Sequence, residues 1–325
     1  MKRKFFLAGA IFFSFLLVPA FTEQDVLQNG GQNTEKNTVQ NKENGSSQTS
    51  SKAEAKISHK NLGFSGYEKP KVAEIRKKYL TTHNEYLKNL LEEAENYRIY
   101  VRLQIEKRNM PLILEYLPVV ESNYKCLARS KSGAAGMWQF MLNSVEPFLV
   151  CNEYIDERLD PWKSTDAALS KLTDNYNMFG DWLLAITAYN CGAGALKRAI
   201  KTAGSSDFWY LMEKGYLSEQ ATSYVPKLLA IADVVENDRY YGVSMPHARG
   251  PGGKTLNISV NDFDYVKVKR SLSLKNIAWE LRIDYEDFKS LNYALIKEVT
   301  PPKTEYALRF PHGMGESAQY VISNM

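Results

Sequence analysis

The chain has 325 residues, of which 44% are hydrophobic and 24% are charged. This balance is typical of a folded protein and excludes collagen-like, wholly disordered and multi-pass membrane chains. The 41 Lys and Arg residues against 37 Asp and Glu residues leave a net charge of +4, so we expect no nucleic-acid partner. Three cysteines without a CxxC spacing, and only four histidines, give no signature of a zinc site.

The N-terminus has the layout of a secretory signal peptide. A basic start, Met1 to Lys4, precedes an uncharged apolar run from Phe5 to Val18, and Pro19-Ala20 supplies small residues for a signal peptidase. The run is shorter than the roughly 20 residues that a membrane-spanning helix needs, and an uncleaved anchor helix is the alternative. We therefore predict that residues 1–20 are a signal peptide. The mature chain is then exported to the periplasm, with membrane association only through this N-terminal segment.

The composition changes twice along the rest of the chain. Residues 21–60 are mainly Gln, Asn, Ser, Lys, Glu and Gly, which bury too little apolar surface to fold, so we predict a disordered linker. Residues 61–245 are predicted to form the main domain, with an N-terminal helical extension. The Gly-rich residues 246–262 are predicted to be a second linker.

Apolar residues recur with helical spacing between residues 70 and 240, and no strand is predicted there. The segment 111–122 is almost wholly apolar, which predicts a buried helix that ends near Glu121. Another helix is predicted to start with Ser164 as its N-cap. Further helices are predicted over residues 137–149, 182–190, 196–202 and 219–236, the last with Ser218 as its N-cap.

The pattern changes after the second linker. Residues 265–269 and 306–310 alternate like strands, and Leu274 to Leu281 and Phe288 to Leu291 have helical spacing. We predict a β-α-α-β module over residues 263–312 and a tail over residues 313–325. The predicted fold class is therefore mainly α, with an all-helical main domain and a small C-terminal module.

Glu121 is the first candidate for chemistry. A carboxyl group at the end of an apolar helix lies in a low dielectric, which disfavours its charged form and raises its pKa. A carboxyl that stays protonated near neutral pH is what a general acid requires. The alternative is a glutamate that reaches solvent or pairs with Arg129.

Three motifs follow one another in a fixed order: Glu121-Ser-Asn123, Gly133-Ala-Ala-Gly-Met-Trp-Gln-Phe140 and Ala188-Tyr-Asn-Cys-Gly192. Over about residues 85 to 235 they resemble the catalytic domain of lytic transglycosylases of the soluble, goose-lysozyme-like type. Residues 156–165 and 179–182 narrow the resemblance to the membrane-bound murein transglycosylase D branch. The resemblance implies a lysozyme-like helical fold.

The resemblance also assigns roles to residues. It implies that Glu121 is the single catalytic acid/base. The family often has a Glu four residues before the Tyr of a Tyr-Val-Pro segment, but here Gln220 precedes Tyr224, with Glu219 beside it. The residues that the resemblance places around the substrate are Ser122, Met137, Gln139, Tyr189, Asn190 and, as a weaker match, Gln220.

The activity implied by the resemblance is cleavage of peptidoglycan glycan strands. The β-1,4 bond between N-acetylmuramic acid and N-acetylglucosamine would be cleaved with formation of a 1,6-anhydro product, and no metal or cofactor is implied. Two alternatives stay open: a muramidase that uses water on the same fold, and a non-catalytic cell-wall binding protein.

The C-terminal module resembles LysM, a small fold that binds peptidoglycan and chitin. The segments Leu274 to Ala278 and Leu291-Asn292 fit this fold, but Ser271-Leu-Ser273 replaces its usual Gly-Asp-Thr turn. The module could tether the enzyme to polymer, or it could simply pack on the main domain.

Export also permits a disulfide between Cys126 and Cys151, with three free thiols as the alternative.

Overall fold

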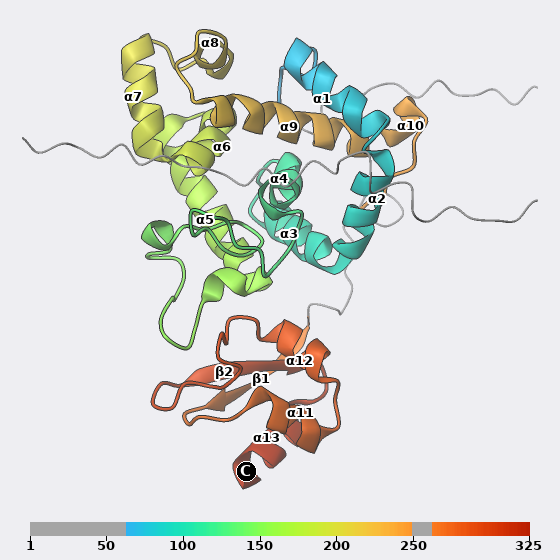
Figure 1. The fold of residues 1–325 in the computed structure, drawn as a ribbon, viewed down its shortest axis with the longest axis vertical. Coiled ribbons are helices and arrows are strands. Elements are labelled where there is room, and N and C mark those ends of the chain that lie inside the picture. Colours follow the sequence, from blue (N-terminus) through green and yellow to red (C-terminus); the bar gives the residue numbers. More distant parts are fainter. Residues whose placement is uncertain (1–62, 249–261) are drawn as a thin grey trace, which may run out of the picture.

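The computed structural model describes residues 63–248 and 262–325. The predicted signal peptide, the linker over 21–60 and most of the linker over 246–262 lie outside these residues. Figure 1 shows a helical body made by the first range and a small module with a sheet made by the second. The predicted fold class, mainly α with a small C-terminal β-containing module, is confirmed. Within the described ranges, no helix has the length and apolarity needed to cross a membrane.

The helical body contains α-helices and three short 3-10 helices, labelled η. Its first half comprises α1 (Pro70–Leu80), α2 (Asn84–Glu93), α3 (Glu95–Lys107), η1 (Leu112–Tyr116), α4 (Leu117–Ser122) and η2 (Leu142–Ser144). Its second half comprises η3 (Glu157–Leu159), α5 (Pro161–Phe179), α6 (Trp182–Cys191), α7 (Ala193–Ala203), α8 (Phe208–Glu213), α9 (Glu219–Glu236) and α10 (Asp238–Tyr241).

Helix α9 organises the core of the body. The hydroxyl of Ser218 accepts a hydrogen bond from the Ala221 amide, as the predicted N-cap requires, and the helix then runs to Glu236 through Pro226. Figure 1 shows α1 lying along α9. The Arg76 guanidinium, 2.6 Å from the buried Asp233 carboxylate, joins the two helices. The predicted helix over 219–236 is confirmed.

Helix α5 starts one turn earlier than predicted. Its N-cap is Asp160, whose carboxylate accepts hydrogen bonds from the amides of Trp162 (3.0 Å) and Lys163 (2.9 Å). Pro161 occupies the first helical position, where a missing N–H costs nothing. The prediction of Ser164 as N-cap is wrong: it lies inside the helix, and its hydroxyl donates to the Asp160 carbonyl.

The predicted helix over 137–149 is also wrong. That stretch is a series of turns, with a single short 3-10 helix, Leu142–Ser144. Gln139 has φ 51° and Gly136 has φ 81°, values that a right-handed helix does not contain. At Gly136 a Cβ atom would lie 1.7 Å from the Arg158 carbonyl oxygen, so only glycine fits this close contact. The predicted helix over 111–122 is divided into η1 and α4.

The C-terminal module is built on a two-stranded antiparallel sheet. Strand β1 (Phe263–Val268) pairs with β2 (Tyr306–Pro311), so that Phe263 lies opposite Pro311. Helices α11 (Leu274–Leu281) and α12 (Tyr285–Leu291) connect the strands in the predicted β-α-α-β order. Residues 313–325 were expected to be a tail, but they contain α13 (Gly315–Asn324), which packs into the module through buried Ala318 and Ile322.

All three cysteines are free in the structure. Cys126 is buried, and Cys151 and Cys191 are partly buried. The alternative of three free thiols therefore describes this structure, and the bridge between Cys126 and Cys151 is not formed.

Candidate active site

The segment that carries Glu121 is anchored firmly in the core. Leu117 and Val119 are buried in α4, and the helix ends where Asn123 and Tyr124 adopt left-handed backbone conformations, with φ values of 56° and 60°. The Tyr124 hydroxyl donates a hydrogen bond to the main-chain oxygen of Glu115, which fixes the chain just after the helix. Glu121 is thus presented at the end of a rigid element.

A cavity of about 50 Å³ lies beside Glu121. Helices α4, α5 and α6 and the turns after Gly133 contribute its walls. Glu121 is the only acidic residue among those that line it. The lining residues are Glu121, Ala134, Gln139, Phe140, Met141, Ser144, Lys171, Tyr189 and Asn190.

Burial raises the pKa of Glu121 to about 7. Two weaker effects lower this pKa: the Tyr224 hydroxyl donates a hydrogen bond to the Glu121 carboxylate, and the positive charge of Lys227 lies nearby. Arg129 is not a partner of Glu121, because its guanidinium pairs with Asp156 at 3.4 Å. No ion pair to Glu121 is found in the parts of the chain that the structure describes, so the carboxyl can hold a proton near neutral pH.

Tyr224 and Lys171 are residues of this site that the sequence analysis missed. Tyr224 lies in α9, is almost fully buried, and makes the hydrogen bond to Glu121 across a sequence separation of 103 residues. Burial, followed by the charge of Glu121, raises the pKa of the Tyr224 phenol. The sequence does contain a signal for Tyr224, because it is the tyrosine of the Tyr-Val-Pro segment. That segment served only to locate Gln220.

Gln220 does not reach the cavity. It is partly buried in the first turn of α9, one helical turn before Tyr224, and it is absent from the cavity lining. Because Gln220 lies on the same helix as Tyr224, it is near the site, but it does not line the cavity.

Ser122 and Met137 contact each other next to the cavity. The Ser122 hydroxyl donates a hydrogen bond of 2.7 Å to the main-chain oxygen of Met137, whose side chain is 1% exposed within the core. Neither residue lines the cavity. The hydrogen bond between them holds the turns after Gly133 against α4.

Gln139, Tyr189 and Asn190 do line the cavity with Glu121. The Gln139 amide donates to the Gly136 carbonyl (2.8 Å), and the Tyr189 hydroxyl donates to the Trp138 carbonyl (2.9 Å), so both side chains are fixed. The Asn190 Oδ1 atom is buried and has no hydrogen-bond partner among the described residues. It is therefore an acceptor that a ligand can satisfy.

Lys171 adds a positive charge to the cavity wall. Burial lowers the pKa of its ammonium group, and Asp174 raises it by a smaller amount. Together the lining offers a protonated carboxyl, a free amide acceptor and an amine. This set suits a polar, uncharged or anionic ligand such as a sugar chain.

Comparison with known proteins identifies two domains in this chain. Residues 102–212 match the family described as Transglycosylase SLT domain, and residues 262–321 match the LysM-like domain of lytic transglycosylase MltD. The membrane-bound lytic murein transglycosylase D of Escherichia coli is 39% identical over 185 residues, which cover 55% of this chain and 40% of the relative. The chain thus spans less than half the length of this curated relative.

Two solved structures are similar to about half of this chain. The 70 kDa soluble lytic transglycosylase of Escherichia coli has 21% identity over 48% of this chain and 26% of its own, with a TM-score of 0.37. An inactive mutant of the lytic transglycosylase Slt of Pseudomonas aeruginosa has 19% identity over 49% of this chain and 26% of its own, with a TM-score of 0.37. The resemblance found in the sequence is confirmed by the domain matches: the chain carries an SLT domain followed by a LysM-like domain of the MltD type.

Proposed function

We propose that this chain is a peptidoglycan lytic transglycosylase in which Glu121 acts as the single acid and base. The observation that carries this proposal is the Glu121 carboxyl, whose pKa burial raises to about 7 and which is the only acid among the described residues that line its cavity. Glycosidases that use water or a protein nucleophile generally need a second carboxylate about 5–9.5 Å from the first. A cavity with one carboxyl fits a reaction in which the substrate supplies the nucleophile.

In the first step, protonated Glu121 donates its proton to the oxygen that joins C1 of N-acetylmuramic acid to N-acetylglucosamine. The C1–O bond breaks, N-acetylglucosamine leaves with the proton, and positive charge develops at C1. The N-acetyl group of the substrate stabilises this charge. Glu121 is left as a carboxylate, which the Tyr224 hydroxyl stabilises by its hydrogen bond.

In the second step, the C6 hydroxyl of the same muramic acid attacks C1. Its proton returns to the Glu121 carboxylate, the C1–O6 bond closes the 1,6-anhydro ring, and no water is consumed. The attack is intramolecular, so it benefits from a high effective concentration. A pKa of about 7 suits both steps, because one group must give up a proton and then take one back.

Other residues of the cavity would hold the sugar. The unpartnered Asn190 Oδ1 atom is suited to accept a hydrogen bond from an N-acetyl N–H group, and Lys171 is suited to a carboxylate of the muramic acid substituent. Gln139, which also lines the cavity and is fixed by its hydrogen bond to Gly136, would offer polar atoms to the same ring. Ser122 and Met137 would hold the turns that carry Gln139, and Gln220 would contribute only at the edge of the cavity.

The cellular setting is part of the same proposal. The N-terminal 20 residues would direct export to the periplasm, and membrane association would depend on that segment alone. The catalytic domain would span residues 61–245. The partner would be the glycan strands of peptidoglycan.

The test is digestion of purified sacculi, followed by mass spectrometry of the released fragments. We expect 1,6-anhydro products from the wild-type protein and none from Glu121→Gln. Reducing ends heavier by one water would assign a muramidase instead. Binding to sacculi without release of any fragment would assign a non-catalytic cell-wall protein.

A further inference from the structure

The C-terminal module is joined to the helical body at residues 150–162, the segment just before α5. The Asp156 amide donates a hydrogen bond of 2.8 Å to the Ala294 carbonyl, and the Ile296 amide donates one of 3.1 Å to the Tyr154 carbonyl. Ile155 of the body is 6% exposed and belongs to the hydrophobic core of the module. The body therefore contributes backbone pairing and a core side chain to the module, which is more than a flexible linker provides.

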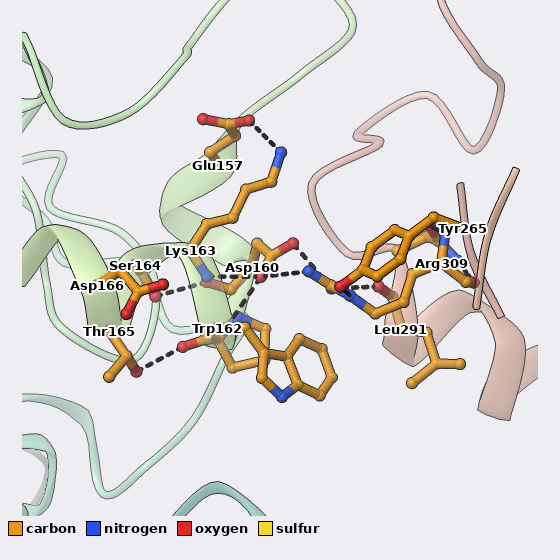
Figure 2. A network of polar contacts seen from close by, with 12 residues as sticks. Glu157, Asp160, Trp162, Lys163, Ser164, Thr165, Asp166, Tyr265, Leu291 and Arg309 are labelled. Atoms are coloured by element: carbon orange, nitrogen blue, oxygen red, sulfur yellow. Dashed lines mark hydrogen bonds and ion pairs between the residues drawn. The ribbon is translucent and has the colours of Figure 1, made fainter. Parts of the chain in front are cut away.

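A buried ion pair crosses the same junction (Figure 2). The guanidinium of Arg309, from β2, lies 3.0 Å from the carboxylate of Asp160 in the body, and the two side chains are 5% and 2% exposed. Arg309 also donates to the Leu291 carbonyl at 2.8 Å. Its guanidinium lies 4.3 Å from the centre of the Trp162 ring, so its charge is compensated and its flat face is covered.

The Asp160 carboxylate makes two sets of contacts. It accepts the Arg309 guanidinium from the module, and it caps α5 by accepting the amides of Trp162 and Lys163. Figure 2 shows Asp160 between α5 and the module, with Trp162 below the guanidinium. The start of α5 is therefore fixed by a residue of the module.

The segment before Asp160 supports the turns of the cavity. Arg158 pairs with Asp156 at 2.8 Å, and its guanidinium donates to the carbonyls of Gly133 (3.0 Å) and Phe140 (3.2 Å). The Arg158 main-chain oxygen fills the space that a Cβ of Gly136 would need. Residues 133–140, the cavity turns that include Gln139, thus rest directly on residues 156–158.

We propose that the C-terminal module braces the cavity turns, residues 133–140, and that Arg309 is a positioning residue. Arg309 fixes Asp160, the 3-10 turn Glu157–Leu159 carries that constraint to Arg158, and Arg158 holds the turns that place Gln139. The proposed effect on catalysis rests on the function proposed above. The structural part of the proposal does not depend on it.

The first test is hydrogen exchange on the full chain after removal of the signal segment. The Gly136 amide donates to the Ala128 carbonyl and the Phe140 amide to the Ala135 carbonyl, and in Arg309→Gln we expect both amides to exchange several-fold faster than in the wild type. The matched control is Lys297→Ala, which removes an exposed ion pair to Glu153 at the same junction and should leave these amides unchanged. Unchanged exchange in Arg309→Gln would overturn the proposal, whatever the activity of the protein.

If Arg309→Gln does not fold, a variant of Asp160, the acidic partner of Arg309, provides the same test. Asp160→Asn keeps an acceptor for the α5 amides, because asparagine is a good N-cap, but loses the charge that holds Arg309. We expect the same faster exchange at Gly136 and Phe140. Protection equal to the wild type in Asp160→Asn would overturn the proposal.

The second test separates a brace from a tether. On a short soluble glycan, Arg309→Gln should lose at least about tenfold in kcat with little change in KM, because a small misplacement of cavity residues lowers the rate of the bound complex. Arg309→Lys should recover part of this loss. A normal kcat on the short glycan, with loss only on whole sacculi, would show that the module is a tether. A wild-type protein that cleaves neither substrate would refute the proposed function and leave the exchange result standing.

Discussion

Two carboxylates six positions apart in the same apolar segment have opposite surroundings. Glu115, in η1, is fully buried and pairs with Arg98 (2.8 Å) and Arg102 (2.5 Å), two guanidiniums that are themselves buried. Glu121, at the end of α4, has a tyrosine hydroxyl as its hydrogen-bond partner and a cavity beside it. One glutamate is therefore enclosed by two cations, whereas the other is left free to take up a proton.

The difference shows that burial alone does not make an acid. The buried Glu115 carboxylate, paired with two arginines of α3, fixes η1 against that helix. A buried carboxyl with a neutral partner has its pKa raised, here to about 7. The partner of each glutamate, and the access of its carboxyl group to the cavity, therefore decide whether that glutamate can act as an acid.

The largest expected effect is on activity at Glu121. Glu121→Gln keeps the size and the hydrogen bond to Tyr224 but cannot transfer a proton, so the rate should fall by about 10²–10⁴-fold. Rates on sacculi, measured by released product, check this. The matched control is Glu92→Gln, an exposed residue of α2, which should retain the wild-type rate. A Glu121→Gln variant with most of its activity would refute the assignment.

The next effect is on stability at Glu115. Glu115→Gln leaves the buried Arg98 charge without its carboxylate, while Arg102 keeps its ion pair with Glu236 (3.2 Å), so the free energy of unfolding should fall by about 3–5 kcal/mol. Urea unfolding followed by circular dichroism measures this change. A loss below about 1 kcal/mol would show that the two arginines find other compensation, and the contrast between the two glutamates would then fail.

The same substitution at Glu121 should have the opposite effect on stability. Because the pKa of Glu121 is higher in the folded chain than in the unfolded chain, the folded state binds more protons and loses stability as the pH rises from about 4.5 to about 7. Glu121→Gln removes this cost, so at pH 8 it should be more stable than the wild type by up to about 3 kcal/mol. At pH 4 the two proteins should be equally stable. Equal stability at pH 8 would show that the carboxyl is not destabilised by burial.

A smaller effect is expected at Tyr224. The Tyr224 hydroxyl lowers the pKa of Glu121 by stabilising the carboxylate, so Tyr224→Phe should raise that pKa. A hydrogen bond to a charged group contributes roughly 1.5–3 kcal/mol, which corresponds to an upward shift of about one pH unit or more. The limb of the pH–rate profile where activity falls with rising pH should move up accordingly. An unmoved limb would remove Tyr224 from the site.

Local signals in the sequence were sufficient for much of the fold. Ser218 before an apolar helical pattern predicted α9, and two alternating segments predicted β1 and β2. Glu121 was found because an apolar run ends in a carboxyl group. Tyr224 was missed as its partner because the two lie 103 residues apart, and no local pattern reports that contact.

Tertiary contacts decided the parts that were predicted incorrectly. Residues 137–149 have helix-compatible composition, but Gln139 and Gly136 adopt positive φ angles because the chain must fit against Arg158. The docking of the module on the main domain was one of two alternatives that the sequence left open. A signal existed, since Arg309 interrupts the apolar strand Tyr306–Pro311 at a buried position, and a buried arginine requires an acidic partner elsewhere.

The most direct test of the account is the titration of the Glu121 carboxyl itself. Carbon NMR of protein labelled at the glutamate side-chain carboxyl, recorded from pH 3 to pH 9, follows each glutamate through its protonation. We predict one resonance that titrates near pH 7 and is absent from the spectrum of Glu121→Gln. If the resonance that disappears in Glu121→Gln instead titrates near pH 4.5, Glu121 is ionised at neutral pH and cannot be the acid of the proposed reaction.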